Sequence, residues 1–134
     1  AVVVLPILDD GSVCLIRNVR LTVGKTLVEL PAGTREPDEP AIESARRELQ
    51  EETGFAAARL EPLASFYTSP GITDEFMHAF VATELTSGTP AREPNEQIEN
   101  LIVSWETALQ MIERGEIEDG KTVLTLLKYQ LQSA

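Results

Sequence analysis

Residues 33–55 read GTREPDEPAIESARRELQEETGF and bring six glutamates, one aspartate and three arginines together between two glycines. From about Pro40 to Thr53, apolar residues recur at spacings of three and four, which is typical of a helix with one buried face. Gly54 stands where a C-terminal helix cap is expected, and Asp38 is a candidate N-cap. The apolar stripe of this predicted helix is Ile42, Ala45, Leu49 and Thr53.

Three carboxylates lie along one flank of the predicted helix. Glu48 and Glu52 are four positions apart and Glu51 is three from Glu48, so their Cβ atoms are neighbours, roughly 5–6 Å apart. Like charges at that spacing repel, whereas hard divalent cations such as Mg²⁺ prefer oxygen ligands and would reverse the effect. The helix alone therefore leaves two interpretations open, a metal site and an acidic face in contact with solvent.

The spacing of the whole segment favours the metal site. It runs Gly33, five residues, Glu39, seven residues, Arg47-Glu48-Leu49, one residue, Glu51-Glu52, one residue, Gly54-Phe55. This pattern resembles the Nudix box at every defined position. The resemblance implies the Nudix fold, an α/β/α sandwich with a mixed β-sheet. It also implies an enzyme that hydrolyses a nucleoside diphosphate linked to another moiety.

The resemblance assigns roles to individual residues of this segment. Glu48 and Glu52 are implied as the principal metal ligands, with Glu51 as a further or water-mediated ligand. Gly33 is expected to let the backbone turn sharply, so that the carbonyl of Ala32 faces a metal.

Arg47 and Glu39 resemble the pair that fixes the loop against the helix in the family. Arg47 and Glu51 are therefore counted among the catalytic residues that the resemblance implies, Arg47 in a positioning role.

Three stretches outside residues 33–55 bear on the substrate: LIRNVR (15–20), ELPAG (29–33) and TSPGITDE (68–75). The SPG turn, fifteen positions after Phe55, resembles that of ADP-ribose pyrophosphatases, and LIRNVR resembles a segment of the same family. An ordinary loop and exposed strand cations are the alternatives. The candidate substrate-binding residues are Arg17, Arg20, Glu29, Pro70, Gly71 and Glu75.

The loop REPNEQIE (92–99) carries Glu93, Glu96 and Glu99. In ADP-ribose pyrophosphatases, a glutamate of the corresponding loop is associated with the attacking water, and Glu96 matches that pattern best. A free glutamate is ionised at neutral pH and able to accept a proton. The alternative is a solvated acidic loop.

The resemblance to ADP-ribose pyrophosphatases implies hydrolysis of ADP-ribose to AMP and ribose 5-phosphate with Mg²⁺ or Mn²⁺. Two alternatives stay open: a hydrolase of another nucleoside diphosphate sugar such as GDP-mannose, and a nucleotide-binding Nudix module without turnover. The resemblance also implies a homodimer whose substrate site uses the partner's N-terminal region.

Composition limits the other possibilities. At 134 residues the chain is expected to form a single Nudix domain, residues 1–134. A net charge of −11 argues against nucleic acid as a partner, and one cysteine, Cys14, excludes an intrachain disulfide. The apolar start AVVVLPIL is too short to span a bilayer, so we expect a cytoplasmic protein. The chain starts within this apolar run and without Met, which suggests a missing or truncated N-terminal segment.

The remaining elements follow from periodicity and turn residues. Two apolar runs around Asp10-Gly11 predict a β-hairpin, with Pro6 at an edge or a bulge. Further strands are expected at TLVEL (26–30), near 59–68 and 75–84, and at IENLIVSW (98–105). WETALQMIERGEI (105–117) and GKTVLTLLKYQL (120–131) have amphipathic helical spacing.

Overall fold

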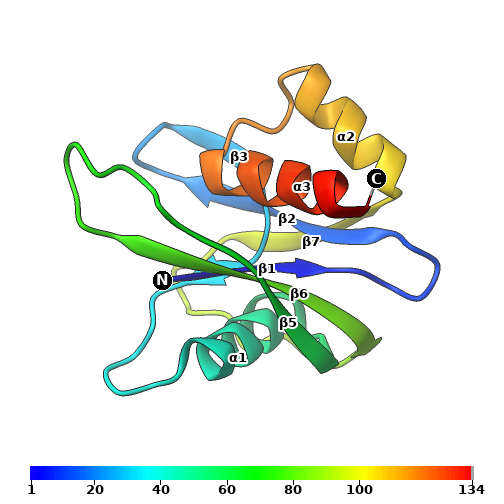
Figure 1. Cartoon of the computed structure of the whole chain (residues 1–134), viewed down its shortest axis with the longest axis horizontal. Coiled ribbons are helices and arrows are strands. Elements are labelled where there is room, and N and C mark those ends of the chain that lie inside the picture. Colours follow the sequence, from blue (N-terminus) through cyan, green and yellow to red (C-terminus); the bar gives the residue numbers. More distant parts are fainter. Residues whose placement is uncertain (134) are drawn as a thin grey trace.

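Two β-sheets form the middle of the molecule, and helices cover them from opposite sides (Figure 1). The computed structural model describes residues 1–133. The strands are β1 (Val2–Pro6), β2 (Val13–Arg20), β3 (Lys25–Glu29), β4 (Ala32–Gly33), β5 (Ala56–Tyr67), β6 (Phe76–Thr86) and β7 (Ile98–Val103). The helices are α1 (Ala41–Thr53), α2 (Trp105–Glu113) and α3 (Gly120–Ser133).

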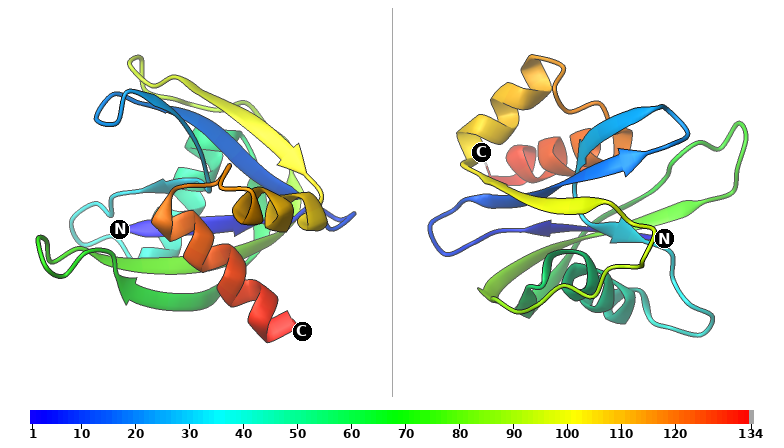
Figure 2. Two further views of the ribbon diagram at one scale, coloured as in Figure 1. Left: turned by 90° about the horizontal axis from the view of Figure 1, so that it is seen from above. Right: turned by 180° about the vertical axis from the view of Figure 1, so that it is seen from behind.

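One sheet has four strands in the order β4-β1-β6-β5 and the other has three in the order β3-β2-β7. The first sheet is mixed, because β1 runs parallel to β6 from Val2 opposite His78 to Pro6 opposite Ala82, while its other pairs are antiparallel. The second sheet is antiparallel throughout. Both further views keep α1 on one side of the sheets and α2 and α3 on the other (Figure 2). The predicted α/β/α sandwich with a mixed sheet is therefore confirmed.

The strand β1 is buried on both faces, which explains its continuous run of apolar residues. Val3 and Leu5 belong to the core on the side of α3, where Leu126 is also fully buried. Val2 and Val4 belong to the core on the side of α1, together with Leu49. The carboxylate-bearing helix is thus held against the central strand by its apolar stripe.

The Asp10-Gly11 turn is present, but the predicted hairpin is wrong. Gly11 has a φ of 86° and its N–H donates to the carbonyl of Leu8 at 2.9 Å. The strands on either side, however, enter different sheets and share only an isolated bridge between Ile7 and Val13. The reason is that β1 and β2 find partners from distant parts of the chain, β6 and β7, so that the local turn does not determine their pairing.

Of the two predicted caps of α1, only the C-terminal one is present. Gly54 takes a left-handed conformation, and its N–H donates to the carbonyl of Gln50, as a C-terminal cap does. At the other end Pro40 is the N-cap, without a side-chain cap bond, and Asp38 lies outside the helix with a φ of 63°. The expected Asp38 cap is therefore wrong, because α1 begins only after Pro40 and the left-handed backbone of Asp38 is not the extended conformation of an N-cap.

Pro6 lies in β1, an inner strand of its sheet, and not in an edge strand as expected; it is tolerated there because β4 pairs only with Val2 and Val3 and leaves that side of Pro6 free. Among residues 1–133, no helix is long and apolar enough to cross a membrane.

Candidate active site

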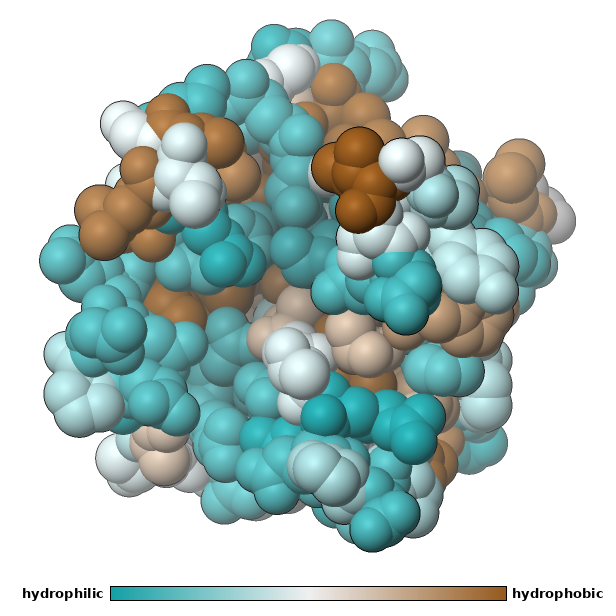
Figure 3. Space-filling model, turned by 90° about the vertical axis from the view of Figure 1, so that its left-hand side faces the viewer, coloured by the Kyte–Doolittle hydropathy of each residue, from teal (hydrophilic) through white to brown (hydrophobic). Residues whose placement is uncertain are grey.

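A pocket of about 270 Å³ opens between the two sheets, beside the start of β1 and the end of α1. Figure 3 shows the left-hand side of Figure 1, where mainly hydrophilic residues gather around a recess. The pocket brings acidic and basic side chains together from five different parts of the chain. Its lining comprises Ala1, Asn18, Arg20, Ala32, Gly33, Thr34, Glu52, Glu75, Met77, Glu96 and Lys121.

Glu52 is the most buried carboxylate of the predicted metal ligands, with 5% of its surface exposed. Its Oε1 accepts a hydrogen bond of 2.9 Å from the backbone N–H of Ala32. Burial raises the pKa of Glu52 to about 8, and the negative charges of Glu48, Glu96 and Glu29 act in the same direction. Burial and the neighbouring carboxylates therefore both disfavour the ionised form of Glu52.

The carbonyl of Ala32 lies on the same side as Glu52. Ala32 pairs with Val3 across the antiparallel β1–β4 ladder, while the neighbouring bond runs from the N–H of Val4 to the carbonyl of Pro31. Ala32 is thus at a position whose N–H and C=O both turn away from β1. Since the N–H reaches Glu52, the carbonyl oxygen projects toward the carboxylates as well.

Gly33 has a different reason to be glycine from the expected sharp turn. It lies in the extended strand β4 and is not among the glycines with positive φ in residues 1–133. A Cβ atom at this position would overlap the carboxyl group of Glu48. Glycine here gives the Glu48 side chain the space to reach the strand, so close approach replaces backbone strain as the explanation.

Arg47 fixes the loop before the helix and also contacts two of the candidate metal ligands. Its guanidinium donates from Nε and Nη2 to Glu39 at 3.1 and 3.0 Å, so the predicted pair is present. Its Nη1 donates to Glu48 at 2.9 Å and to Glu51 at 3.3 Å. The Arg47 bonds, together with a bond from the hydroxyl of Ser44, lower the pKa of Glu39 to about 2. Glu39 is therefore ionised at any pH near neutrality and holds Arg47 in a fixed orientation.

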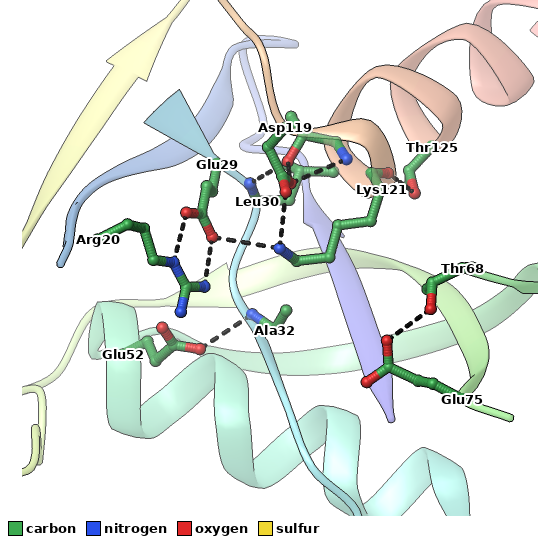
Figure 4. Close-up of polar contacts among 11 residues, drawn as sticks. Arg20, Glu29, Leu30, Ala32, Glu52, Thr68, Glu75, Asp119, Lys121 and Thr125 are labelled. Carbon is green, nitrogen blue, oxygen red and sulfur yellow. Dashed lines mark hydrogen bonds and ion pairs between the residues drawn. The ribbon is translucent and has the colours of Figure 1, made fainter. Parts of the chain in front are cut away.

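Two basic side chains, those of Arg20 and Lys121, also line the pocket (Figure 4). Glu29 is 1% exposed, and both of its oxygens accept from Arg20 at 2.8 Å. Lys121, in the first turn of α3, donates to Glu29 at 3.2 Å and to Asp119 at 3.0 Å. Glu29, predicted to bind substrate, thus lies beneath the pocket and holds the two cations that line it.

The anchor of Lys121 extends into the start of α3. The carboxylate of Asp119 accepts from the backbone N–H of Thr122 at 3.2 Å and from its hydroxyl at 2.6 Å. The same hydroxyl oxygen accepts from the N–H of Leu30 at 2.9 Å. Because Leu30 directly follows Glu29, helix α3 and the ELPAG stretch are joined at the place where the cations are held.

The predicted loop residues 70, 71 and 75 separate in the structure. Glu75 lines the pocket, accepts from the hydroxyl of Thr68 at 2.7 Å and lies at the base of the β5–β6 hairpin loop. Pro70 and Gly71 are exposed in that loop and are not among the pocket residues. Their contribution is to the turn, in which the N–H of Thr73 donates to the carbonyl of Ser69 at 2.9 Å.

Arg17 and Arg20, which were predicted as a pair, point to opposite faces of their sheet. Three positions separate them on β2, and successive side chains of a strand alternate between faces. Arg17 forms an ion pair with Glu99 at 3.3 Å, outside the pocket that Arg20 lines. A substrate in the pocket therefore meets Arg20, and the expected contact with Arg17 has no support in the geometry.

Of the three glutamates in the 92–99 loop, only Glu96 lines the pocket. It is half-buried, whereas Glu93 and Glu99 are exposed. Its Oε1 accepts a 2.6 Å bond from the N–H of Glu93, which leaves Oε2 available. The charge of Glu96 also contributes to the raised pKa values of Glu48 and Glu52. Position thus favours Glu96 over the other two.

The carboxylates fit a divalent cation by their chemistry. Carboxylate and carbonyl oxygens are the ligands of Mg²⁺ and Mn²⁺, and the concentrated negative charge around Glu52 would be relieved by positive charge. Within residues 1–133, no three acidic, histidine or cysteine side chains are gathered as a finished metal site. Arg47 holds Glu48 and Glu51, and Ala32 holds Glu52, so a bound cation would draw these side chains together.

Sequence reasoning missed Lys121 and Arg92. Lys121 could have been noticed, because it is a basic residue in the first turn of a predicted helix, in the stretch GKT. Arg92 gave none, because its partners, a backbone carbonyl forty positions earlier and the side chain of Asn100, do not form a recognisable sequence pattern with it. Its Nε donates to the carbonyl of Glu52 at 2.9 Å.

The NUDIX domain model matches residues 1–126. The chain therefore belongs to the Nudix family and is a Nudix hydrolase, a class of enzyme that generally needs divalent metal ions.

Its relatives include proteins acting on nucleotide sugars. It is 40% identical to the ADP-ribose pyrophosphatase of Bacillus subtilis (strain 168), over 100% of this chain and 74% of the relative. It is 36% identical to the GDP-mannose pyrophosphatase of Cronobacter sakazakii (strain ATCC BAA-894), over 92% of this chain and 69% of the relative. A crystal structure of an ADP compounds hydrolase has the same fold, with a TM-score of 0.89 at 24% identity, over 98% of this chain and 70% of that one.

Proposed function

We propose that this protein hydrolyses the pyrophosphate bond of ADP-ribose to AMP and ribose 5-phosphate, using Mg²⁺ or Mn²⁺. The observation that carries the proposal is a single pocket whose lining brings Glu52 and Glu96 together with Arg20 and Lys121. A pyrophosphate needs both kinds of group, since its charge requires cations and its hydrolysis requires an activated water. The 40% identity to an ADP-ribose pyrophosphatase supports ADP-ribose as the sugar nucleotide.

Each residue has a task in this reaction. Glu48, Glu51, Glu52 and the carbonyl of Ala32 would hold the metal, and Arg47 with Glu39 orients the loop and the helix around them. When bound, the cation supplies Lewis-acid stabilisation of the phosphate oxygens.

The protein's own groups carry the other steps. Arg20, held by Glu29, donates hydrogen bonds to the phosphate, and Glu75 accepts from a ribose hydroxyl. Glu96 takes the proton of the attacking water at Oε2. The oxygen of that water bonds to one phosphorus atom while the bridging P–O bond breaks, and the bridging oxygen leaves with the other phosphate.

A turnover assay tests the proposal. The purified protein is given ADP-ribose with Mg²⁺, with Mn²⁺ and with EDTA, and AMP is measured by chromatography. We expect AMP and ribose 5-phosphate in equal amounts, only with metal. A protein that binds ADP-ribose but releases no AMP with either metal would instead be a nucleotide-binding module. The three acidic residues at positions 48, 51 and 52 argue against that outcome, because binding alone does not require them.

GDP-mannose is the second candidate substrate, and the 36% identity to a GDP-mannose pyrophosphatase favours it. The residues that line the pocket suit both substrates, because the roles proposed for them concern the metal, the pyrophosphate and the ribose and not the base. Comparison of kcat/KM for ADP-ribose and GDP-mannose separates the two. We expect ADP-ribose to be preferred, and a higher value for GDP-mannose would reverse the assignment.

A single domain over residues 1–134, a homodimer and a cytoplasmic location belong to the same proposal, on the strength of the family resemblance. Sedimentation of the purified protein at micromolar concentration measures the oligomeric state. A monomer at all concentrations would remove the dimer from the proposal.

A further inference from the structure

The C-terminal end of α1 is closed by a part of the chain that lies some forty residues later. The last four carbonyls of an α-helix have no partner within the helix and need donors from elsewhere. In α1 these are the carbonyls of residues 50 to 53, and Glu51 and Glu52 are candidate metal ligands. The way in which these carbonyls find donors therefore affects the helix at the centre of the site.

Only one of the four donors is local. The N–H of Gly54 donates to Gln50 at 2.9 Å, as in an ordinary cap. The N–H of Ala91 donates to the carbonyl of Glu51 at 2.9 Å. The Nε of Arg92 donates to the carbonyl of Glu52 at 2.9 Å.

The remaining carbonyl, that of Thr53, accepts a 3.0 Å bond from Nδ2 of Asn100. Arg92 and Asn100 also bond to each other, from Nη2 to Oδ1 at 3.1 Å. These two residues lie four positions before and four positions after Glu96. The loop that carries Glu96 is thus tied to the end of α1 on both of its sides.

The backbone contact beside this connection is also close. A Cβ atom at Gly88 would come within 2.8 Å of the carbonyl oxygen of Gly54, and one at Gly54 would overlap the carbonyl of Gly88. The two segments therefore approach to a distance that only glycine allows. Such an approach fixes the start of the loop against the helix.

We propose that Arg92, together with Asn100, is a positioning residue for the hydrolysis: it sets the place of Glu96 relative to the carboxylates of α1. This inference rests on the proposed function, because it assigns Glu96 the role of accepting the proton of water. A guanidinium is suited to the task, since it donates in two directions from one rigid plane and its charge is favourable at a helix C-terminus. Arg92 uses both directions, one for the helix and one for β7.

A double-mutant cycle separates this role from simple support of the helix. The variants are Arg92→Gln, Arg92→Lys, Glu96→Gln and the double variant Arg92→Gln/Glu96→Gln, with Arg114→Gln as the control. Arg114 is exposed and lies at the end of α2, away from the pocket. The kcat and KM are measured at saturating Mg²⁺ with the substrate that the wild type turns over best.

We expect Arg92→Gln to lower kcat about 10- to 100-fold with KM changed less than threefold, and Arg92→Lys to restore part of the loss. In the Glu96→Gln background, Arg92→Gln should lower kcat by less than threefold, because residues that act through one another are not additive. Full additivity in the double variant, or a loss confined to KM, would overturn the inference.

Amide hydrogen exchange provides a readout that does not depend on the substrate. Arg92→Gln should increase exchange in the 93–97 segment, whereas Arg114→Gln should leave it unchanged. Unchanged exchange in Arg92→Gln would also overturn the inference. Failure of the proposed function is distinguishable, since a wild type without turnover of any nucleoside diphosphate sugar would still give the exchange result.

Discussion

Glu52→Gln should have opposite effects on stability and on catalysis. The pKa of Glu52 is about 8 in the folded protein, against an ordinary value of 4.5, chiefly because the side chain is buried. Between these two values, the folded state keeps a proton that the unfolded state has released. The free energy of unfolding of the metal-free protein therefore falls as the pH rises from 4.5 to 8.

The size of the effect follows from the shift. Each pKa unit corresponds to about 1.4 kcal/mol, so the loss from this one group reaches about 3 kcal/mol at pH 7 and at most about 5 kcal/mol above pH 8. Glutamine has no proton to release and keeps an oxygen that accepts from the N–H of Ala32. The variant should therefore be more stable than the wild type in EDTA at pH 8, and should differ little near pH 4.5.

Metal should reduce this difference in stability between the variant and the wild type. A divalent cation at 100 times its dissociation constant adds about 2.7 kcal/mol to the wild type, whereas the variant lacks one ligand and should gain much less. Its kcat should fall by several orders of magnitude. Urea unfolding from pH 5 to 9, with EDTA and with Mg²⁺, measures the first two effects and a turnover assay the third. Glu43→Gln, an exposed change on the same helix, is the control. A variant that is less stable than the wild type in EDTA at pH 8, or that keeps kcat within tenfold, would refute the reasoning.

Three further predictions concern the rest of the pocket. Glu96→Gln should lower kcat about 10²- to 10⁴-fold with little change in KM, whereas Glu99→Gln should keep kcat and KM near the wild-type values. Steady-state kinetics of both variants test this. A defect in Glu99→Gln alone would assign the role of accepting the proton of water to Glu99. Gly33→Ala should weaken Mn²⁺ binding at least tenfold in a titration, because the added methyl group overlaps the helix carboxylate that faces it; unchanged Mn²⁺ affinity would exclude that carboxylate as a ligand. Lys121→Met should raise KM about tenfold with a small change in kcat, while Lys128→Met, on the exposed side of the same helix, should leave both values unchanged. Equal kinetics in the two variants would exclude a role of Lys121 in substrate binding.

Local features of the chain could be predicted from the sequence because they depend on neighbours along the chain. The helix 41–53 and its glycine cap follow from apolar spacing and from the φ of 86° that Gly54 adopts without strain. The ion pair of Arg47 with Glu39 also follows, since only Pro40 and the first turns of α1 separate the two residues and the resemblance named both. In each case the partners lie within fifteen positions.

Features that depend on strand pairing could not be predicted in the same way. The Asp10-Gly11 turn was visible, yet nothing local shows that β1 pairs with β6 and β2 with β7. The same limit applies to Arg17 and Arg20. The alternation along β2 places them on different faces, but only the packing of the two sheets determines which face meets the carboxylates.

Partners that are backbone atoms leave the weakest trace in a sequence. Arg92 lies in a loop that is dense in turn-forming residues, and its hydrogen bonds go to a carbonyl and to Asn100. Gly33 is a different case, because the sequence identified this residue but the expected reason, a sharp turn of the backbone, is not the one that the structure gives. Its neighbour, the carboxyl group of Glu48, becomes evident only when helix and strand are placed side by side.

The pairing of β1 with β6 affects how the protein folds while it is synthesised on the ribosome. The strand β1, Val2–Pro6, finds its parallel neighbour only when His78–Ala82 has been made. At roughly 5–20 residues per second, this apolar strand waits for several seconds without its partner. Contacts between such distant parts of a chain slow folding, and apolar segments stay exposed and prone to aggregation until these contacts form. A nascent chain that ends before β6 lacks part of the four-stranded sheet. We therefore expect enzymatic activity to arise late in translation, once the second half of the chain has emerged.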